Sequence, residues 1–129
     1  MSKITQPRRA KPHAFEYLYR DAANWKTHGV VLLSGRCPPN LHADIVGALD
    51  SGMYFVAEQV KIPALQRRHN AEHGAATEDL DHGFHEFVAL RPATAADIKQ
   101  AECVLPADVI SKLFGRARNR WNCSLSPYA

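Results

Sequence analysis

The stretch FEYLYRDAANWKTHGVVLL, residues 15–33, decides the fold class because it carries two strand patterns joined by a polar connection. Its first aromatic residues, Phe15, Tyr17 and Tyr19, occupy every second position, a period that places one aromatic row on one face of a strand. After the polar residues 21–29, residues 30–33 form a second apolar run that ends at Ser34 and Gly35. We expect two strands paired as an antiparallel hairpin with a long loop.

Similar patterns outward from this hairpin predict the other elements. Asn40 can cap a helix whose stripe is Leu41, Ile45, Ala48 and Leu49. Residues 53–57 and 84–90 favour strands, residues 64–73 a short polar helix, and residues 75–81 a loop. Thr94 and Asp97 have the spacing of a capping box for a helix reaching about Val104, and a last helix starts at Pro106. The apolar face of that last helix is Val109, Ile110, Leu113, Phe114 and Ala117.

These elements predict a single-domain α+β protein, with about four mainly antiparallel strands, helices packed on one face and a helical C-terminus. A chain of 129 residues with 46% hydrophobic and 22% charged residues fits one such domain. We expect residues 1–13 to be a flexible basic arm, residues 14–121 to be the domain and residues 122–129 to be a C-terminal tail. The chain contains no internal repeat.

The cysteines and the apolar runs indicate a compartment. The three cysteines, Cys37, Cys103 and Cys123, are far apart and form no C-x-x-C pair, so neither a disulfide framework nor a thiolate zinc site is indicated. The basic N-terminus is not followed by an apolar stretch of signal-peptide length, and no run is long enough to span a membrane. We therefore expect a cytoplasmic protein that does not enter membranes.

Residues 69–87, HNAEHGAATEDLDHGFHEF, hold four of the seven histidines and five of the thirteen acidic residues. Within them, His69, Glu72 and His73 form the pattern H-x-x-E-H, in which two histidines one helical turn apart can bind zinc while the glutamate orients a water. Glu78, His82 or Glu86 could supply a third ligand for a metal-dependent hydrolase. Because five-residue patterns also arise by chance, the favoured interpretation is a solvated polar helix without a cofactor, with zinc only under this alternative.

The second half of the same region is a weaker candidate. On a strand over residues 84–90, His85 and Glu86 point to opposite faces and cannot chelate together. His82 with Asp81 could form an acid–base pair or supply a metal ligand, since histidine titrates near neutral pH. A hydrogen-bonded structural histidine is the favoured alternative.

Basic residues near the C-terminus form a third candidate. Lys112, Arg116 and Arg120 fall at helical spacing, with Arg118 and Trp121 beside them, so they could hold phosphates while the indole stacks on a base. The pattern is equally typical of a solvated helix face, and cations near a helix C-terminus favour its dipole. The net charge of +3 is too small to identify a partner.

Residues 17–29 (YLYRDAANWKTHG), 52–66 (GMYFVAEQVKIPALQ) and 81–87 (DHGFHEF) resemble segments of a family of small bacterial proteins that has no established function. The match covers roughly residues 15–92. Trp25 stands where that family has tyrosine and Phe84 where it has tryptophan, and H-x-x-E-H falls in a variable segment. The resemblance implies no activity, but it directs attention to the polar residues Arg20, Asp21, Asn24, Lys26, Asp81, His82, His85 and Glu86.

These eight residues are therefore the candidates for binding a ligand or partner. Arg20 and Asp21 could bind the acid–histidine segment if the first and fourth strands are neighbours, which would make either an internal network or a cleft. The leading hypothesis is a small binding protein without catalytic activity, such as an inhibitor, an immunity protein or a regulator. It would act on a protein partner, favoured over nucleic acid, through its aromatic edge or acidic loop. The oligomeric state stays open, a homodimer included.

Overall fold

The computed structural model describes residues 12–74 and 83–126, and in this part of the chain five strands form one sheet in the order β3-β4-β1-β2-β5. The strands are β1 (His13–Arg20), β2 (Lys26–Ser34), β3 (Tyr54–Val56), β4 (Phe84–Pro92) and β5 (Cys103–Pro106). β2 and β5 pair in parallel, and the other neighbours pair antiparallel. The structure thus confirms a single α+β domain with a mainly antiparallel sheet, and corrects the expected number of strands from four to five.

The predicted hairpin is present, but its second strand starts earlier than expected. β2 begins at Lys26 rather than at Val30, because Thr27 pairs with Tyr19 and Gly29 pairs with Tyr17. A Cβ at Gly29 would lie 2.9 Å from Leu65 Cδ2 and 3.1 Å from Tyr17 Cε1. Thr27 and Gly29 carry small side chains because the tyrosine rings and Leu65 fill the space beside them. Residues 26–29 therefore lack the alternation of large apolar and polar residues that identifies a strand in a sequence.

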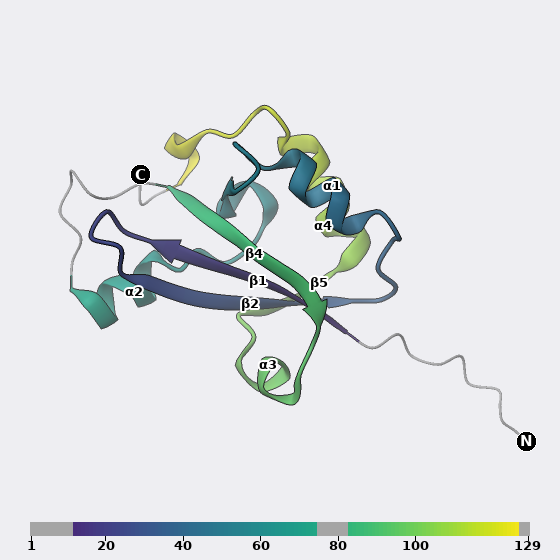
Figure 1. Cartoon of the computed structure of the whole chain (residues 1–129), viewed down its shortest axis with the longest axis horizontal. Helices are drawn as coiled ribbons and strands as arrows, with labels where there is room; N and C mark the ends of the chain where they lie inside the picture. The colour runs from purple at the N-terminus through teal and green to yellow at the C-terminus, as the bar shows by residue number, and fades with distance from the viewer. Residues whose placement is uncertain (1–11, 75–82, 127–129) are drawn as a thin grey trace, which may run out of the picture.

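The helices lie on both sides of the sheet. α1 (Leu41–Ala48) and α4 (Ala107–Ala117) pack together on one side, and α3 (Ala95–Gln100) lies on the other (Figure 1). α2 (Gln66–His73) packs beside β2, and two 3₁₀ helices complete the fold, η1 (Ala57–Val60) and η2 (Cys123–Leu125). The expectation that all helices cover one face is therefore wrong for α3, which is held on the opposite face by polar contacts described below.

The core forms between the sheet and the pair α1 and α4. The alternating aromatic residues of β1, Phe15, Tyr17 and Tyr19, are completely buried, and so are Phe55 of β3 and Phe114 of α4. Their rings contact one another at centroid separations such as 5.7 Å for Phe15 and Phe55. Because each buried aromatic side chain removes about 150–250 Å² from water, this cluster dominates the stabilisation of the fold.

Two local features of the sheet differ from the expected pattern. The helix predicted to reach Val104 ends at Gln100, and Cys103–Pro106 instead form β5, paired with Val31–Ser34 of β2. In β4, the partner of Glu16 is Ala89 and the partner of Tyr17 is Phe87, so Val88 is an extra residue that forms a β-bulge. Val88 is consequently 42% exposed.

Several other predictions are confirmed. α1 has the predicted stripe, with Leu41, Ile45 and Ala48 buried, and α2 lies within the predicted range 64–73. Thr94 and Asp97 form the predicted capping box at the start of α3. Over the two described ranges, none of the helices has the length and apolar character needed to span a membrane.

Candidate functional site

The polar residues at the end of β1 form an internal network with β4. The Arg20 guanidinium donates from Nε to Glu86 Oε2 at 2.8 Å and from Nη2 to Glu86 Oε1 at 3.3 Å. It also donates to the side-chain oxygen of Asn24. Since β1 and β4 are neighbours, the expected contact between Arg20 and the acid–histidine segment is confirmed. Arg20 and Asn24 thereby fix the conformation of the β1–β2 turn.

Asp21 makes a second connection, to a buried histidine. Asp21 Oδ2 lies 2.8 Å from His69 Nε2, and His69 Nδ1 lies 2.8 Å from Thr27 Oγ1. An ionised carboxylate can only accept a hydrogen bond, so His69 donates from Nε2 to Asp21, and its Nδ1 shares a hydrogen bond with the Thr27 hydroxyl. Burial tends to raise the pKa of Asp21, but its bonds to His69 and to the Trp25 amide outweigh this and lower the pKa. We call Asp21, His69 and Thr27 the histidine node.

The histidine node has the order carboxylate, imidazole, hydroxyl that activates a nucleophile in many hydrolases. Its burial argues for a different role. Thr27 is 4% exposed and His69 is 1% exposed. The His69 ring also packs edge-on against Tyr19 at a centroid distance of 4.9 Å. A substrate carbonyl could not approach the Thr27 hydroxyl, so the node connects α2 to the β1–β2 hairpin.

The H-x-x-E-H pattern lies on α2, as predicted, but it does not form a chelate. Both ring nitrogens of His69 are engaged by Asp21 and Thr27. The His73 ring stacks on Trp25 with centroids 5.2 Å apart, and Glu72 is 51% exposed. Among the described residues, no three histidine, cysteine or acidic side chains are grouped so that they could hold a metal ion.

The other candidate binding residues do not lie together in one site. The His85 ring is buried on the inner face of β4 and accepts a hydrogen bond from the Leu65 amide at 2.9 Å, which anchors the start of α2. Glu86 points to the other face, as the strand period required. Lys26 is exposed at the start of β2. Glu78, Asp81 and His82 lie outside the described residues.

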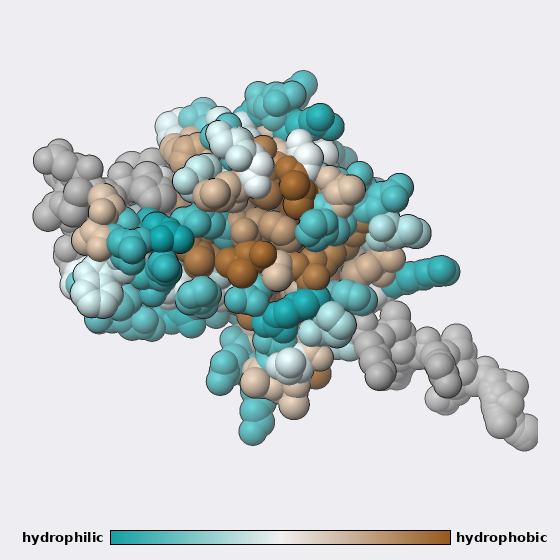
Figure 2. Space-filling model, in the orientation of Figure 1, coloured by the Kyte–Doolittle hydropathy of each residue, from teal (hydrophilic) through white to brown (hydrophobic). Residues whose placement is uncertain are grey.

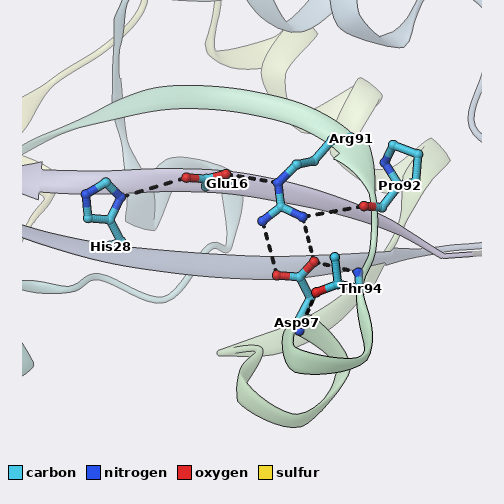
Figure 3. A network of polar contacts seen from close by, with 6 residues as sticks. All are labelled: Glu16, His28, Arg91, Pro92, Thr94 and Asp97. Atoms are coloured by element: carbon cyan, nitrogen blue, oxygen red, sulfur yellow. Dashed lines mark hydrogen bonds and ion pairs between the residues drawn. The ribbon is translucent and has the colours of Figure 1, made fainter.

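A polar network around Arg91, whose contacts the sequence did not indicate, lies on the outer face of the sheet and includes the predicted capping box of Thr94 and Asp97 (Figure 3). Arg91 of β4 donates to Glu16 Oε1 at 3.0 Å and to the two Asp97 oxygens at 2.6 and 3.1 Å. The bonds to Asp97 and Glu16 raise the pKa of Arg91, while those from Arg91 and Thr94 lower the pKa of Asp97. This network holds α3 on the outer face.

Beside the Arg91 network the surface is hollowed by about 190 Å³. The lining side chains include Glu16, His28, Arg91 and Asp97, together with Arg68 and Glu102, which pair at 3.4 Å. Arg68 also donates to the His28 carbonyl. Because the acids and bases of this hollow bind one another, its polar groups serve to hold α2, α3 and the sheet together.

The basic residues near the C-terminus lie differently from the prediction. α4 ends at Ala117, because Arg118 has ψ of 127° and Asn119 has φ of 61°, so Arg120 is not on the helix. Trp121 does not stand open for stacking. Its indole donates to the Ala48 carbonyl at 2.8 Å, and its ring packs on Phe114 with centroids 5.8 Å apart.

The arginines instead surround a hollow. Arg116, Arg118 and Arg120 are exposed and, with Gly115 and Asn119, line a depression of about 340 Å³. We call it the arginine hollow. Lys112 is exposed one turn earlier on α4 and is not among its lining residues.

An apolar surface lies between β4 and α1, which we call the apolar seam: Met53, Phe87, Val88 and Leu90. Met53 is 44% and Val88 42% exposed, while Phe87 and Leu90 are partly buried against the core. The Met53 carbonyl accepts a hydrogen bond from the Phe87 amide, which joins the parts of the seam. Figure 2 shows hydrophobic residues gathered over the middle of β4 and toward α1, with hydrophilic residues around them.

Sequence reasoning missed three features, because the local sequence around each gives little or no sign of it. The seam was read as strand interior, and only the unbroken run FVAL, which does not alternate, indicates the bulge that exposes Val88. Arg91 lies just after the strand predicted over residues 84–90, and no local pattern indicates its contacts with Glu16 and Asp97. The third feature is Trp25, which is 58% exposed at the β1–β2 turn. Its neighbours Asn24 and Lys26 were candidate binding residues, but Trp25 itself was not.

Comparison of the chain with protein-family models, with curated proteins and with solved structures gives no match. Its function is therefore argued from its geometry.

Proposed function

We propose that this protein is a binding protein without catalytic activity, and that it engages a protein partner through the apolar seam. The observation that carries the proposal is the seam itself, in which two well-exposed apolar side chains, Met53 and Val88, adjoin the partly buried Phe87 and Leu90. Contiguous apolar surface rimmed by polar residues marks interaction sites, because its removal from water drives association.

The composition of the seam supports a protein partner. Methionine and phenylalanine are enriched in the cores of protein interfaces, and methionine adapts its shape to a partner. The Phe87 ring is held in place by Phe15 at 5.1 Å and by His42 of α1 at 5.8 Å between centroids. A side chain that is already fixed loses little conformational freedom on binding, which favours affinity.

The charge next to the seam indicates the character of the partner. Asp50 is exposed in the turn that precedes Met53, where its backbone carbonyl accepts a hydrogen bond from the Met53 amide. Asp44 is exposed on α1, which has no Lys or Arg. A complementary partner presents an apolar side chain flanked by basic residues.

The seam differs from the surface named by the sequence hypothesis. Arg20, Asp21, Asn24 and Glu86 hold the β1–β2 turn and its neighbours in place. His85 holds the start of α2. An accessory role as an inhibitor, an immunity protein or a regulator remains part of the proposal.

The test compares partners captured from the native host by three proteins: the wild type, Met53→Asp/Val88→Asp, and the matched control Ile98→Asp/Val104→Asp. The control adds two acids at apolar sites that are 57% and 58% exposed on α3 and β5. We expect one stoichiometric partner with the wild type and the control, and its loss with the seam variant. All three proteins should keep the same melting transition.

Retention of the partner by the seam variant, or equal loss with the control, would contradict the proposal. Light scattering of the isolated protein identifies the case in which the partner is a second copy, since the wild type would then be a dimer and the seam variant a monomer.

A further inference from the structure

We propose that the arginine hollow binds the phosphate backbone of a nucleic acid without reading its sequence. The inference stands independently of the apolar seam. Three exposed arginines, Arg116, Arg118 and Arg120, line one depression of about 340 Å³. No acidic residue is among the five that line it.

The three guanidinium groups are available to a ligand. In the part of the chain that the structure describes, no hydrogen bond or ion pair connects them to a protein carboxylate, whereas Arg91 binds two acids and Arg20 binds one. Like charges gathered without a counter-charge repel one another, and a bound anion removes that repulsion. Arginine also binds phosphate oxygens through two parallel N–H donors, which suits it to this ligand.

The backbone that carries the arginines is fixed. The Arg118 amide donates to the Phe114 carbonyl at 3.0 Å and the Arg120 amide to the Ala117 carbonyl at 2.8 Å, so a tight turn follows α4. Gln59 of η1 donates to the Arg120 carbonyl at 3.1 Å. The next residue, Trp121, is anchored by its own hydrogen bond to the Ala48 carbonyl. The hollow is therefore a preformed surface, which reduces the ordering cost of binding.

The shape of the basic surface favours a polymer over a single phosphate compound. Exposed Lys112 lies four residues before Arg116 on α4, about 6 Å along the helix axis, so positive charge continues beyond the hollow. The hollow has no aromatic lining residue, and Trp121 is engaged with the core. A site with cations but no stacking platform contacts phosphates and not bases, which gives binding independent of sequence.

The experiment measures anisotropy of a labelled duplex DNA of random sequence over a series of salt concentrations. The test variant is Arg116→Gln/Arg118→Gln/Arg120→Gln. The matched control is Arg36→Gln/Arg67→Gln/Lys99→Gln, which removes the same charge from exposed sites elsewhere. Each phosphate contact contributes about 0.9 to the slope of log K against log salt, so the test variant should lose about 2–3 from the slope and the control should keep it.

Three results would overturn the proposal. The first is a wild-type protein that fails to bind DNA or RNA at low salt. The second is an equal loss of affinity in the test and control variants, which would reflect net charge alone. The third is binding of inorganic phosphate or ATP that depends on the three arginines, without binding of nucleic acid, which would assign the hollow to a small phosphate compound.

Discussion

The histidine node allows a quantitative prediction about how α2 is fastened to the hairpin. His69→Phe keeps an aromatic ring beside Tyr19 but removes both hydrogen bonds, and it leaves the Thr27 hydroxyl buried without its partner. An unsatisfied buried hydroxyl costs about 1–3 kcal/mol, and a lost bond to a carboxylate about 1.5–3 kcal/mol. Because Asp21 can recover water at the edge of the node, we expect a total loss of about 2–4 kcal/mol.

The second variant separates the two terms. Thr27→Val removes the hydroxyl and keeps the shape of the side chain, so it should cost about 1 kcal/mol in the wild type, where the bond to His69 is lost. In the His69→Phe background the same change removes a hydroxyl that has no partner, and it should be neutral or stabilising. The double-mutant cycle should therefore give a coupling of about 1–2 kcal/mol.

Urea denaturation followed by circular dichroism measures the free energy of unfolding of all four proteins. Additive losses, with a coupling below about 0.5 kcal/mol, would refute the reasoning, because independent sites add to within that margin. So would a His69→Phe protein as stable as the wild type.

Two further predictions concern the sheet. Asp97→Asn removes the carboxylate that Arg91 binds and should cost about 1.5–3 kcal/mol in thermal or urea unfolding at pH 7. Since folding lowers the pKa of Asp97, the contribution of its carboxylate to stability is complete above about pH 4 and is lost as the pH falls further. The Asp97→Asn protein should therefore lose less stability between pH 4 and pH 2 than the wild type. Parallel curves of unfolding free energy against pH would refute this. Gly29→Ala places a Cβ 2.9 Å from Leu65 and should destabilise the protein by about 1–3 kcal/mol in urea unfolding. The control is Gly47→Ala on α1, where the added Cβ meets open space and should stabilise the protein by about 0.5–1 kcal/mol. Equal effects of the two substitutions would argue against tight packing at Gly29.

The fold could be predicted where local periodicity and packing agree. The alternation of Phe15, Tyr17 and Tyr19 gave the first strand, and the capping pattern at Thr94 gave the start of α3. The fifth strand could not be found in this way. Cys103–Pro106 is four residues long and exists as a strand because it pairs with β2, a contact between segments about 70 residues apart.

The candidate site, too, could be predicted only in part from the sequence. Arg20 and Asp21 were predicted to bind the acid–histidine segment on the condition that β1 and β4 are neighbours. That condition holds, and Arg20 binds Glu86 of the segment, but Asp21 binds His69 of α2. The burial of His69 depends on Asp21 and Thr27, more than 40 residues away, so an isolated H-x-x-E-H pattern gave no sign of it. For the basic residues, a helical period was extended past Ala117, where the helix ends.

The bulge at Val88 bears on how the molecule avoids uncontrolled self-association. β3 covers only Phe84–Glu86 of β4, which leaves the rest of that strand at the rim of the sheet. An extra residue breaks the even spacing of backbone donors and acceptors there, and Pro92 offers no amide proton at all. Copies of the chain consequently have no regular ladder on which to stack into fibrils along β4.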